Sequence, residues 1–317
     1  MVANLRVISP EKNVLPSSLV KHDSLTQAWD RIRRAHAMHT RGPPKKGVLI
    51  YGGSGSGKTF VAKQYEKLHS SIVTDTKTIR PIFYFRFKEA QKSTPDILKL
   101  LIKALGTTPP KGKTESGELY EQFILLVQSL GVELIILDEI QQVLPKSDGI
   151  TALNTLKYFC ALLDELSASI VFIGSTRAMS LITFGQNDKT IEDNEQLSRR
   201  MMRPIELLDI IPSTEEWVAC VNWFLSQINF PHLTASDSNL LDRIYIAYTE
   251  RKFATLESLF LLENMDSIQN KEILIKRLKR NFDIYCKGKY NPFSQKQYPD
   301  EDVKSTIDKH YKQCEED

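Results

Sequence analysis

The stretch GGSGSGKT, residues 52–59, constrains the fold of this chain more than any other. It satisfies the pattern G-x-x-x-x-G-K-[ST], with Gly52, Gly57, Lys58 and Thr59 at the fixed positions. An apolar run, GVLIYG, precedes it, and a helical pattern from Lys58 to about His69 follows. A buried strand, a glycine-rich turn and a helix in this order form the structural context that a P-loop requires.

A P-loop binds phosphate groups through its backbone. Glycines let successive N–H groups point inward at the phosphates, and the helix amino terminus adds the positive end of its dipole. We expect Lys58 to reach the β- and γ-phosphates and the Thr59 hydroxyl to coordinate magnesium. ATP and Mg2+ are therefore the expected cofactors, and the alternative is a glycine-rich turn without a ligand. The expected nucleotide contacts are Gly52, Gly53, Ser54, Gly55, Ser56, Gly57, Lys58, Thr59 and Phe60.

A second motif, LIILDE at residues 134–139, supplies the acidic half of such a site. Its four apolar residues predict a buried strand, at whose carboxyl end Asp138 is placed to hold magnesium. Glu139 follows directly and is suited to orient and deprotonate a water molecule. An Asp-Glu pair alone is more often a solvated strand end, but together with the P-loop it predicts ATP hydrolysis.

Strands and helices alternate through the first two thirds of the chain. Strands are expected at 47–52, 81–87, 132–140 and 168–176, and helices at 22–39, 58–69, 94–106, 116–131 and 151–166. This alternation predicts an α/β fold with a parallel sheet and right-handed crossovers. From about Ile211 only helical patterns follow, at 213–228, 235–250, 253–268 and 271–286.

The chain of 317 residues, 41% of them hydrophobic, is long enough for two domains. We predict an N-terminal arm (1–20), a nucleotide-binding α/β domain (21–210), a helical lid domain (211–286) and a C-terminal tail (287–317). The tail carries little apolar surface, so we expect a weakly ordered arm.

Composition excludes several other classes. No apolar run is long enough for a membrane helix, and the amino terminus does not have the order of a secretory signal, so we expect a soluble, cytoplasmic protein. The four cysteines are far apart, which argues against both a zinc site and a disulfide framework and favours free thiols. The net charge of +3 gives no reason by itself to expect nucleic acid binding.

Two further polar clusters are candidates for the hydrolytic site. Ser175 follows the fourth expected strand, where its hydroxyl could sense the γ-phosphate or cap a helix. Arg199 and Arg200, with Arg203 nearby, precede the helical domain. Such arginines are often surface charge, but one of them could stabilise the transition state in a neighbouring subunit.

The order of these motifs resembles that of the AAA+ ATPases, on the side of the initiators and helicase loaders. GGSGSGKT, IILDEIQQV, FIGSTRAM and EQLSRRM before a proline are similar to the transposon-encoded regulators of the TnsC/TniB type, over roughly residues 20–265. The short chain is similar to the compact forms found with CRISPR-associated transposons.

The resemblance implies a role for each of these residues. It implies that Lys58 and Thr59 bind the nucleotide and that Asp138 and Glu139 serve magnesium binding and hydrolysis. It also implies that Ser175 is the first sensor and that Arg199 or Arg200 is the arginine finger. The second-sensor arginine has no clear match, and Arg251 is the best candidate. The resemblance also implies a homo-oligomer, a ring or helical filament on duplex DNA, that links a target-site selector to a transposase.

A basic segment between Arg86 and Lys113 is the local support for DNA binding. It holds seven basic residues against two acidic ones and includes the helices expected between the second and third strands. Such a run is often a solvated helix face, whereas the resemblance favours sequence-independent contacts with the DNA backbone. The expected contacts are Lys88, Lys99, Lys103, Lys111 and Lys113.

A helicase loader or chaperone-like ATPase acting on a protein partner would carry the same motifs, as would a signalling ATPase whose lid binds a partner. The basic 86–113 segment is the feature that separates the DNA-binding hypothesis from these two alternatives.

Overall fold

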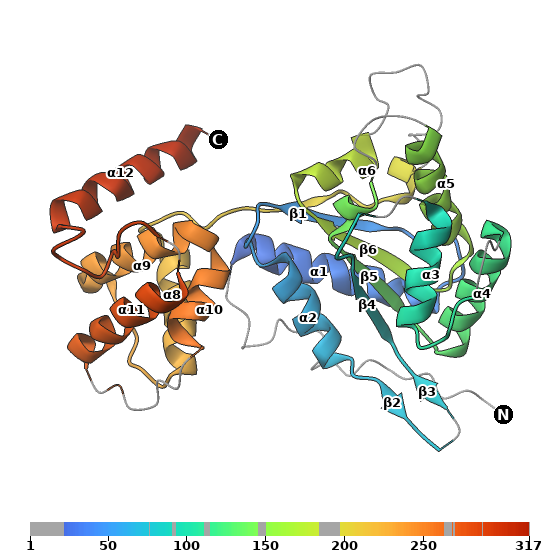
Figure 1. Cartoon of the computed structure of the whole chain (residues 1–317), viewed down its shortest axis with the longest axis horizontal. Coiled ribbons are helices and arrows are strands. Elements are labelled where there is room, and N and C mark those ends of the chain that lie inside the picture. Colours follow the sequence, from blue (N-terminus) through green and yellow to red (C-terminus); the bar gives the residue numbers. More distant parts are fainter. Residues whose placement is uncertain are drawn as a thin grey trace. The chain divides into compact units, whose positions relative to one another are not determined.

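The computed structural model describes residues 22–75, 77–90, 93–110, 115–144, 150–183, 197–262, 268, 270–286 and 288–316. The described residues divide into two compact units (Figure 1). The first, an α/β unit, comprises residues 27–53 and 58–207. The second, a helical unit, comprises residues 22–26, 54–57 and 208–316.

The α/β unit is built on a five-stranded parallel sheet. Its strands are β1 (Val48–Gly52), β4 (Ile82–Arg86), β5 (Leu134–Asp138), β6 (Ser169–Gly174) and β7 (Ile205–Leu207), in the spatial order β4-β5-β6-β1-β7. β5 and β6 are buried along their whole length, as expected for a parallel sheet covered on both faces. The parallel α/β core confirms the predicted fold class.

Helices follow the strands as the alternating pattern predicted. In chain order they are α1 (Asp23–Ala37), α2 (Lys58–Leu68), α3 (Thr94–Ala104), α4 (Ser116–Ser129), α5 (Ile150–Glu165) and α6 (Ser180–Thr183). Figure 1 shows α3 and α4, the two helices between β4 and β5, side by side. Ser93 begins α3 by accepting a hydrogen bond from the backbone of Asp96, the usual N-cap arrangement.

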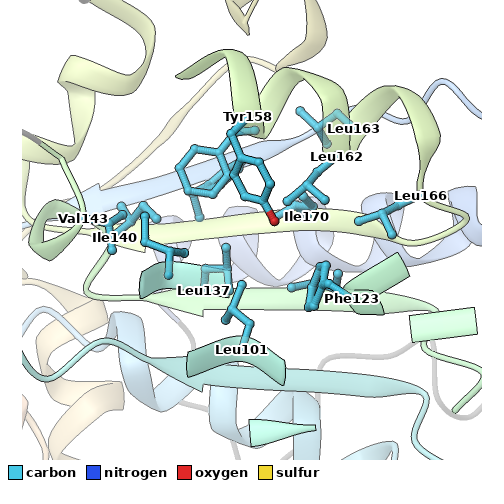
Figure 2. Packing of buried hydrophobic residues seen from close by; sticks show 14 of the residues in the cluster. Leu101, Phe123, Leu137, Ile140, Val143, Tyr158, Leu162, Leu163, Leu166 and Ile170 are labelled. Carbon is cyan, nitrogen blue, oxygen red and sulfur yellow. The ribbon is translucent and has the colours of Figure 1, made fainter. Parts of the chain in front are cut away.

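The apolar core lies between the sheet and these helices. Figure 2 shows side chains of α3, α4 and α5, among them Leu101, Phe123 and Leu162, gathered around the strands that carry Leu137 and Ile170. All five are at most 1% exposed. This packing fixes β5, the strand that carries the acidic pair.

The sequence did not predict every strand. The four expected strands are present, but β7, which pairs with β1 through Ile50 and Ile205, was missed. An antiparallel pair, β2 (Ile72–Val73) and β3 (Thr78–Ile79), was also missed. Strands of two or three residues are too short to show a period of their own.

The helical unit contains α8 (Glu215–Gln227), α9 (Ser238–Arg251), α10 (Phe253–Phe260), α11 (Lys271–Tyr285) and α12 (Asp300–Glu316). The first four were predicted, although α10 ends at Phe260 and residues 263–267 of the expected helix lie outside the described residues. Among the described helices, none is long and apolar enough to cross a membrane. Cys160, Cys220 and Cys286 are free thiols.

The expectation of a weakly ordered C-terminal arm was wrong. Residues 300–316 form α12, which packs on α9 and buries Val303 and Ile307. Arg243 of α9, only 5% exposed, donates hydrogen bonds to the backbone carbonyl of Tyr298 (3.0 Å) and to the carboxylate of Asp300. A buried charge of this kind requires such partners, so the segment is held by few but specific contacts.

Candidate nucleotide-binding and hydrolysis site

The P-loop has the backbone conformation that its glycines allow. β1 ends at Gly52 and α2 begins at Lys58, as predicted. Gly52, Gly55 and Gly57 have φ angles of 155°, 78° and 90°, values that side-chain-bearing residues rarely adopt. A Cβ atom added at Gly57 would also lie 3.2 Å from Leu25. Substitution at Gly57 would therefore strain the loop.

Lys58 folds back against the loop. Its side chain is 9% exposed, and its Nζ donates to the carbonyl oxygen of Gly52 at 3.0 Å and to that of Gly53. The ammonium charge and the glycine-rich backbone are thus brought together. This is the pairing of a point charge and a flexible backbone that suits phosphate oxygens.

Asp138, at the carboxyl end of β5, is the centre of the acidic half. It is 1% exposed, and its Oδ2 accepts hydrogen bonds from Thr59 Oγ1 and Tyr84 OH, both at 2.7 Å. Burial and the neighbouring Asp138 raise the pKa of Tyr84, so its hydroxyl keeps the proton that it donates. The structure therefore brings together Thr59 and Asp138, the two residues predicted to hold magnesium.

Glu139 adopts an uncommon backbone conformation. Its φ and ψ angles are 58° and 40°, in the left-handed region, which costs a non-glycine residue about 1–2 kcal/mol. Its backbone N–H donates to Asp138 Oδ1 at 2.8 Å, and its carboxylate accepts hydrogen bonds from Arg86 (3.1 Å) and from Gln141 Nε2. These contacts hold the carboxylate beside Asp138 in a defined orientation.

Gln141 connects Glu139 with the end of β6. Its Oε1 accepts a hydrogen bond from the backbone N–H of Ser175 at 3.1 Å. A Cβ atom at Gly174 would lie 2.6 Å from that oxygen, so only glycine permits this approach. Ser175 is the N-cap residue of a short 3-10 helix, Thr176–Met179, but its side chain makes no cap hydrogen bond.

The two candidate finger arginines differ in their surroundings. Arg200 forms a bidentate pair with Asp164, with both N–O distances 2.7 Å, and the pair raises the pKa of Arg200. Arg199 is exposed. A guanidinium held by two hydrogen bonds to a carboxylate is a stable structural contact. We therefore propose the more exposed Arg199, and not Arg200, as the residue presented to a neighbour.

The remaining sequence candidates are the lysines of the basic segment and Arg251. Lys88 and Lys103 are exposed and Lys99 is half-buried. Lys111 and Lys113 lie outside the described residues. Arg251 is the last residue of α9, and its side chain also lies outside what the structure describes.

Three residues of the site were not identified from the sequence: Tyr84, Arg86 and Gln141. Arg86 was counted in the basic segment, but it pairs with Glu139. The register of β4 against β5, which sets Arg86 opposite Asp138, accounts for this contact. The available signals were the position of Arg86 at a strand end and the position of Gln141 two residues after Glu139.

Replacing Gln141 by alanine should lower kcat for ATP hydrolysis roughly tenfold or more, because a correctly oriented general base contributes about 10²–10⁴ in rate. KM for ATP should stay unchanged, since Gln141 contacts the carboxylate and not the P-loop. Steady-state phosphate release measures both constants. Gln142→Ala is the matched control, because only the backbone N–H of Gln142 bonds to Glu139, at 2.9 Å. Equal kcat values in the two variants would contradict the positioning role of Gln141.

Comparison with known proteins agrees with this geometry. The family model described as "Bacterial TniB protein" matches residues 13–204, more than half of the chain. No curated protein matches the sequence. The solved structures similar to this chain include two archaeal proteins and one bacterial protein.

The Aeropyrum pernix Orc1 protein, solved in complex with DNA, is 16% identical, with 95% of this chain and 86% of that chain covered and a TM-score of 0.41. Cdc6p from Pyrobaculum aerophilum is 12% identical (94% and 97% covered, TM-score 0.45). Domain III of Thermotoga maritima DnaA is 14% identical (83% and 94% covered, TM-score 0.48). These sequence identities and TM-scores are too low to indicate the function of this chain. The family match stands without them: the chain, built on a P-loop and a parallel sheet, belongs to the bacterial TniB protein family.

Proposed function

We propose that this ATPase regulates DNA transposition: it assembles with ATP on duplex DNA and links a target-site selector to the transposase. The observation that carries the proposal is the cluster of Lys58, Thr59, Asp138 and Glu139 in a chain of the TniB family. A DNA-associated role also accounts for the expected cytoplasmic location.

The residues fit ATP and Mg2+. The Thr59 hydroxyl and the Asp138 carboxylate are oxygen ligands, the type that Mg2+ prefers, and they are already 2.7 Å apart. Lys58 would bind the β- and γ-phosphates, and residues 52–57 and Phe60 would surround the nucleotide. Bound ATP supplies the phosphoanhydride bond whose hydrolysis drives the cycle. Glu139 would accept the proton of the attacking water, and we propose Ser175, the residue after β6, as the γ-phosphate sensor.

The helical residues 211–286 are proposed to act as a lid that responds to the P-loop. Within the helical unit, the backbone N–H of Phe253, the first residue of α10, donates to the carbonyl oxygen of Gly55 at 3.2 Å. Leu25 and Phe253 also lie against Gly57. A change in the conformation of the loop would therefore directly alter its contacts with α10.

The DNA-binding proposal rests on lysines near the two helices that follow β4. On α3, Ile97, Leu98, Leu101 and Ile102 are buried, which places Lys99 and Lys103, one turn apart, on the outer side. Lys88 is exposed shortly before α3. Lysine is a flexible point charge suited to phosphates and not to base edges, so we propose contacts with the DNA backbone that do not depend on sequence.

Replacing Lys88, Lys99 and Lys103 together by glutamine should weaken binding to two unrelated duplexes equally. The slope of log K against log salt should flatten by about 0.9 for each phosphate that the variant no longer neutralises. Fluorescence anisotropy over a salt series, with ATP and with ADP, measures the effect. The matched control replaces Lys304, Lys309 and Lys312, three exposed lysines of α12. If both triple variants bind DNA as the wild type does, the α3 lysines are a solvated face.

Electron microscopy of the purified protein with ATP, with and without duplex DNA, tests the proposal as a whole. Rings or filaments that enclose duplex DNA are the expected result. Assemblies that form with ATP but never contain DNA would contradict it and favour a helicase loader or chaperone-like ATPase.

A further inference from the structure

A second polar cluster lies at the opposite end of β5 from the nucleotide site. Glu133 directly precedes the first residue of β5, whereas Asp138 is its last. Five strand residues span about 16 Å. The side chains of His36, in the last turn of α1, and of His39, in the short 3-10 helix Met38–Thr40, join Glu133 there. All three belong to the α/β unit.

Three donor atoms of this cluster face one another. His36 Nε2 lies 2.8 Å and His39 Nε2 lies 3.7 Å from the same oxygen, Oε2 of Glu133. The three donor atoms lie within 4.8 Å of one another. An ion bound tetrahedrally at bond lengths of 2.0–2.2 Å holds its ligand atoms about 3.4 Å apart. The two separations from Glu133 Oε2, 2.8 Å and 3.7 Å, lie on either side of this value.

The backbone contact of His39 determines that its Nδ1 carries a proton. Its Nδ1 lies 2.6 Å from the carbonyl oxygen of His36 and must donate its proton there. In the neutral ring the lone pair of Nε2 then faces the Glu133 carboxylate. A cation bound between these two electron-pair donors would be attracted to both.

The surroundings of His36 resemble the outer shell of a metal ligand. His36 is 1% exposed, and its Nδ1 lies 2.9 Å from the hydroxyl of Tyr65. Burial raises the pKa of Tyr65, so this hydroxyl stays protonated. When His36 Nδ1–H donates to the oxygen of this hydroxyl, Nε2 keeps its lone pair for a metal, and ligating histidines are typically oriented by such a hydrogen bond from the other ring nitrogen. Arg33 adds a positive charge near Tyr65, but it also pairs with Asp30 at 3.5 Å.

We propose that His36, His39 and Glu133 bind a transition-metal ion of the zinc class, with water as the fourth ligand. Two imidazole nitrogens and one carboxylate oxygen suit Zn2+ or Co2+, whereas Mg2+ and Ca2+ prefer oxygen ligands alone. The cysteine spacing had argued against a zinc site, but this one uses no cysteine. The ion would join the end of α1 to the start of β5 and stabilise the α/β unit without touching the nucleotide.

The test uses tag-free, full-length protein freed of metal by a chelator and then dialysed. Addition of CoCl2 should produce the visible absorption of tetrahedral Co2+ at one equivalent per chain, and ZnSO4 should displace it. Zn2+ should also raise the Tm of the wild type. His39→Gln and Glu133→Gln should each weaken Zn2+ binding at least about 100-fold, the upper end of the effect of losing an outer-shell partner alone.

His232→Gln is the matched control, because it removes an exposed histidine from the helical unit. It should bind Zn2+ as the wild type does. No Co2+ spectrum in the wild type, or equal Zn2+ affinity in the His39, Glu133 and His232 variants, would overturn the proposal. In that case the cluster is a hydrogen-bonded group of side chains that binds no metal ion. None of these results depends on ATP hydrolysis or DNA binding.

Discussion

Lys58→Ala should abolish ATP binding, whereas Glu139→Gln should keep ATP bound and lower turnover by about two to four orders of magnitude, the usual contribution of a general base. The two changes differ because the residues act at different stages. Lys58 places its charge against Gly52 and Gly53 in the loop that would hold the phosphates. Glu139 follows Asp138, the proposed magnesium residue, and is proposed to contribute only when water attacks.

The measurement compares nucleotide affinity, from a fluorescent ATP analogue, with phosphate release. Lys63→Ala and Glu121→Gln are matched controls, because they remove an exposed lysine of α2 and an exposed glutamate of α4. Both should leave affinity and turnover unchanged. Wild-type turnover in Glu139→Gln would remove the assigned role of Glu139, and tight ATP binding by Lys58→Ala would remove that of Lys58.

The sequence predicted those parts of the fold whose signal is local. The P-loop is a contiguous motif between a strand and a helix, and its ends fall where the structure has them. β7 is different, because three residues acquire a strand conformation only through β1, a partner more than 150 residues earlier in the chain. α12 likewise depends on a partner distant in the sequence, because Arg243 of α9 donates a hydrogen bond to Asp300, the first residue of α12.

The sequence likewise predicted those parts of the candidate site whose signal is local. The P-loop motif led to Thr59 and the end of a buried strand led to Asp138, and the structure joins the two side chains. Arg86 was not identified as a residue of this site, because its contact with Glu139 follows from the register between two strands and not from any local pattern. The histidine cluster was also missed, since His36 and Glu133 are 97 positions apart in the chain and meet only in the fold.

The finger assignment predicts that ATP hydrolysis requires two subunits. Arg199 is exposed in the α/β unit, whereas Arg200 is bound to Asp164. Arg199→Ala should lower ATPase activity on the order of a thousandfold or more, the effect of an arginine that stabilises the transition state from a neighbouring subunit. ATP affinity of the isolated subunit should stay unchanged, because Arg199 is proposed to act on the nucleotide of its neighbour.

Arg200→Ala should have a different effect. Removal of its bidentate pair leaves Asp164 without this partner, so the Tm should fall. Arg203→Ala, which removes another exposed arginine of the same segment, is the matched control and should alter neither activity nor Tm. A thousandfold drop in activity in Arg200→Ala with an unchanged Tm would reverse the assignment of the two arginines.

Mixing inactive variants distinguishes action between subunits from action within one. A subunit carrying Arg199→Ala retains Glu139, and a subunit carrying Glu139→Gln retains Arg199. When the second donates its arginine to the site of the first, that site is complete, so a mixture of the two inactive proteins should recover hydrolysis. If Arg199 instead acts within its own subunit, no mixture of the two variants contains a complete site. Phosphate release measured across a range of mixing ratios should therefore peak at intermediate ratios, and a mixture as inactive as its components would exclude Arg199 as a finger acting in trans.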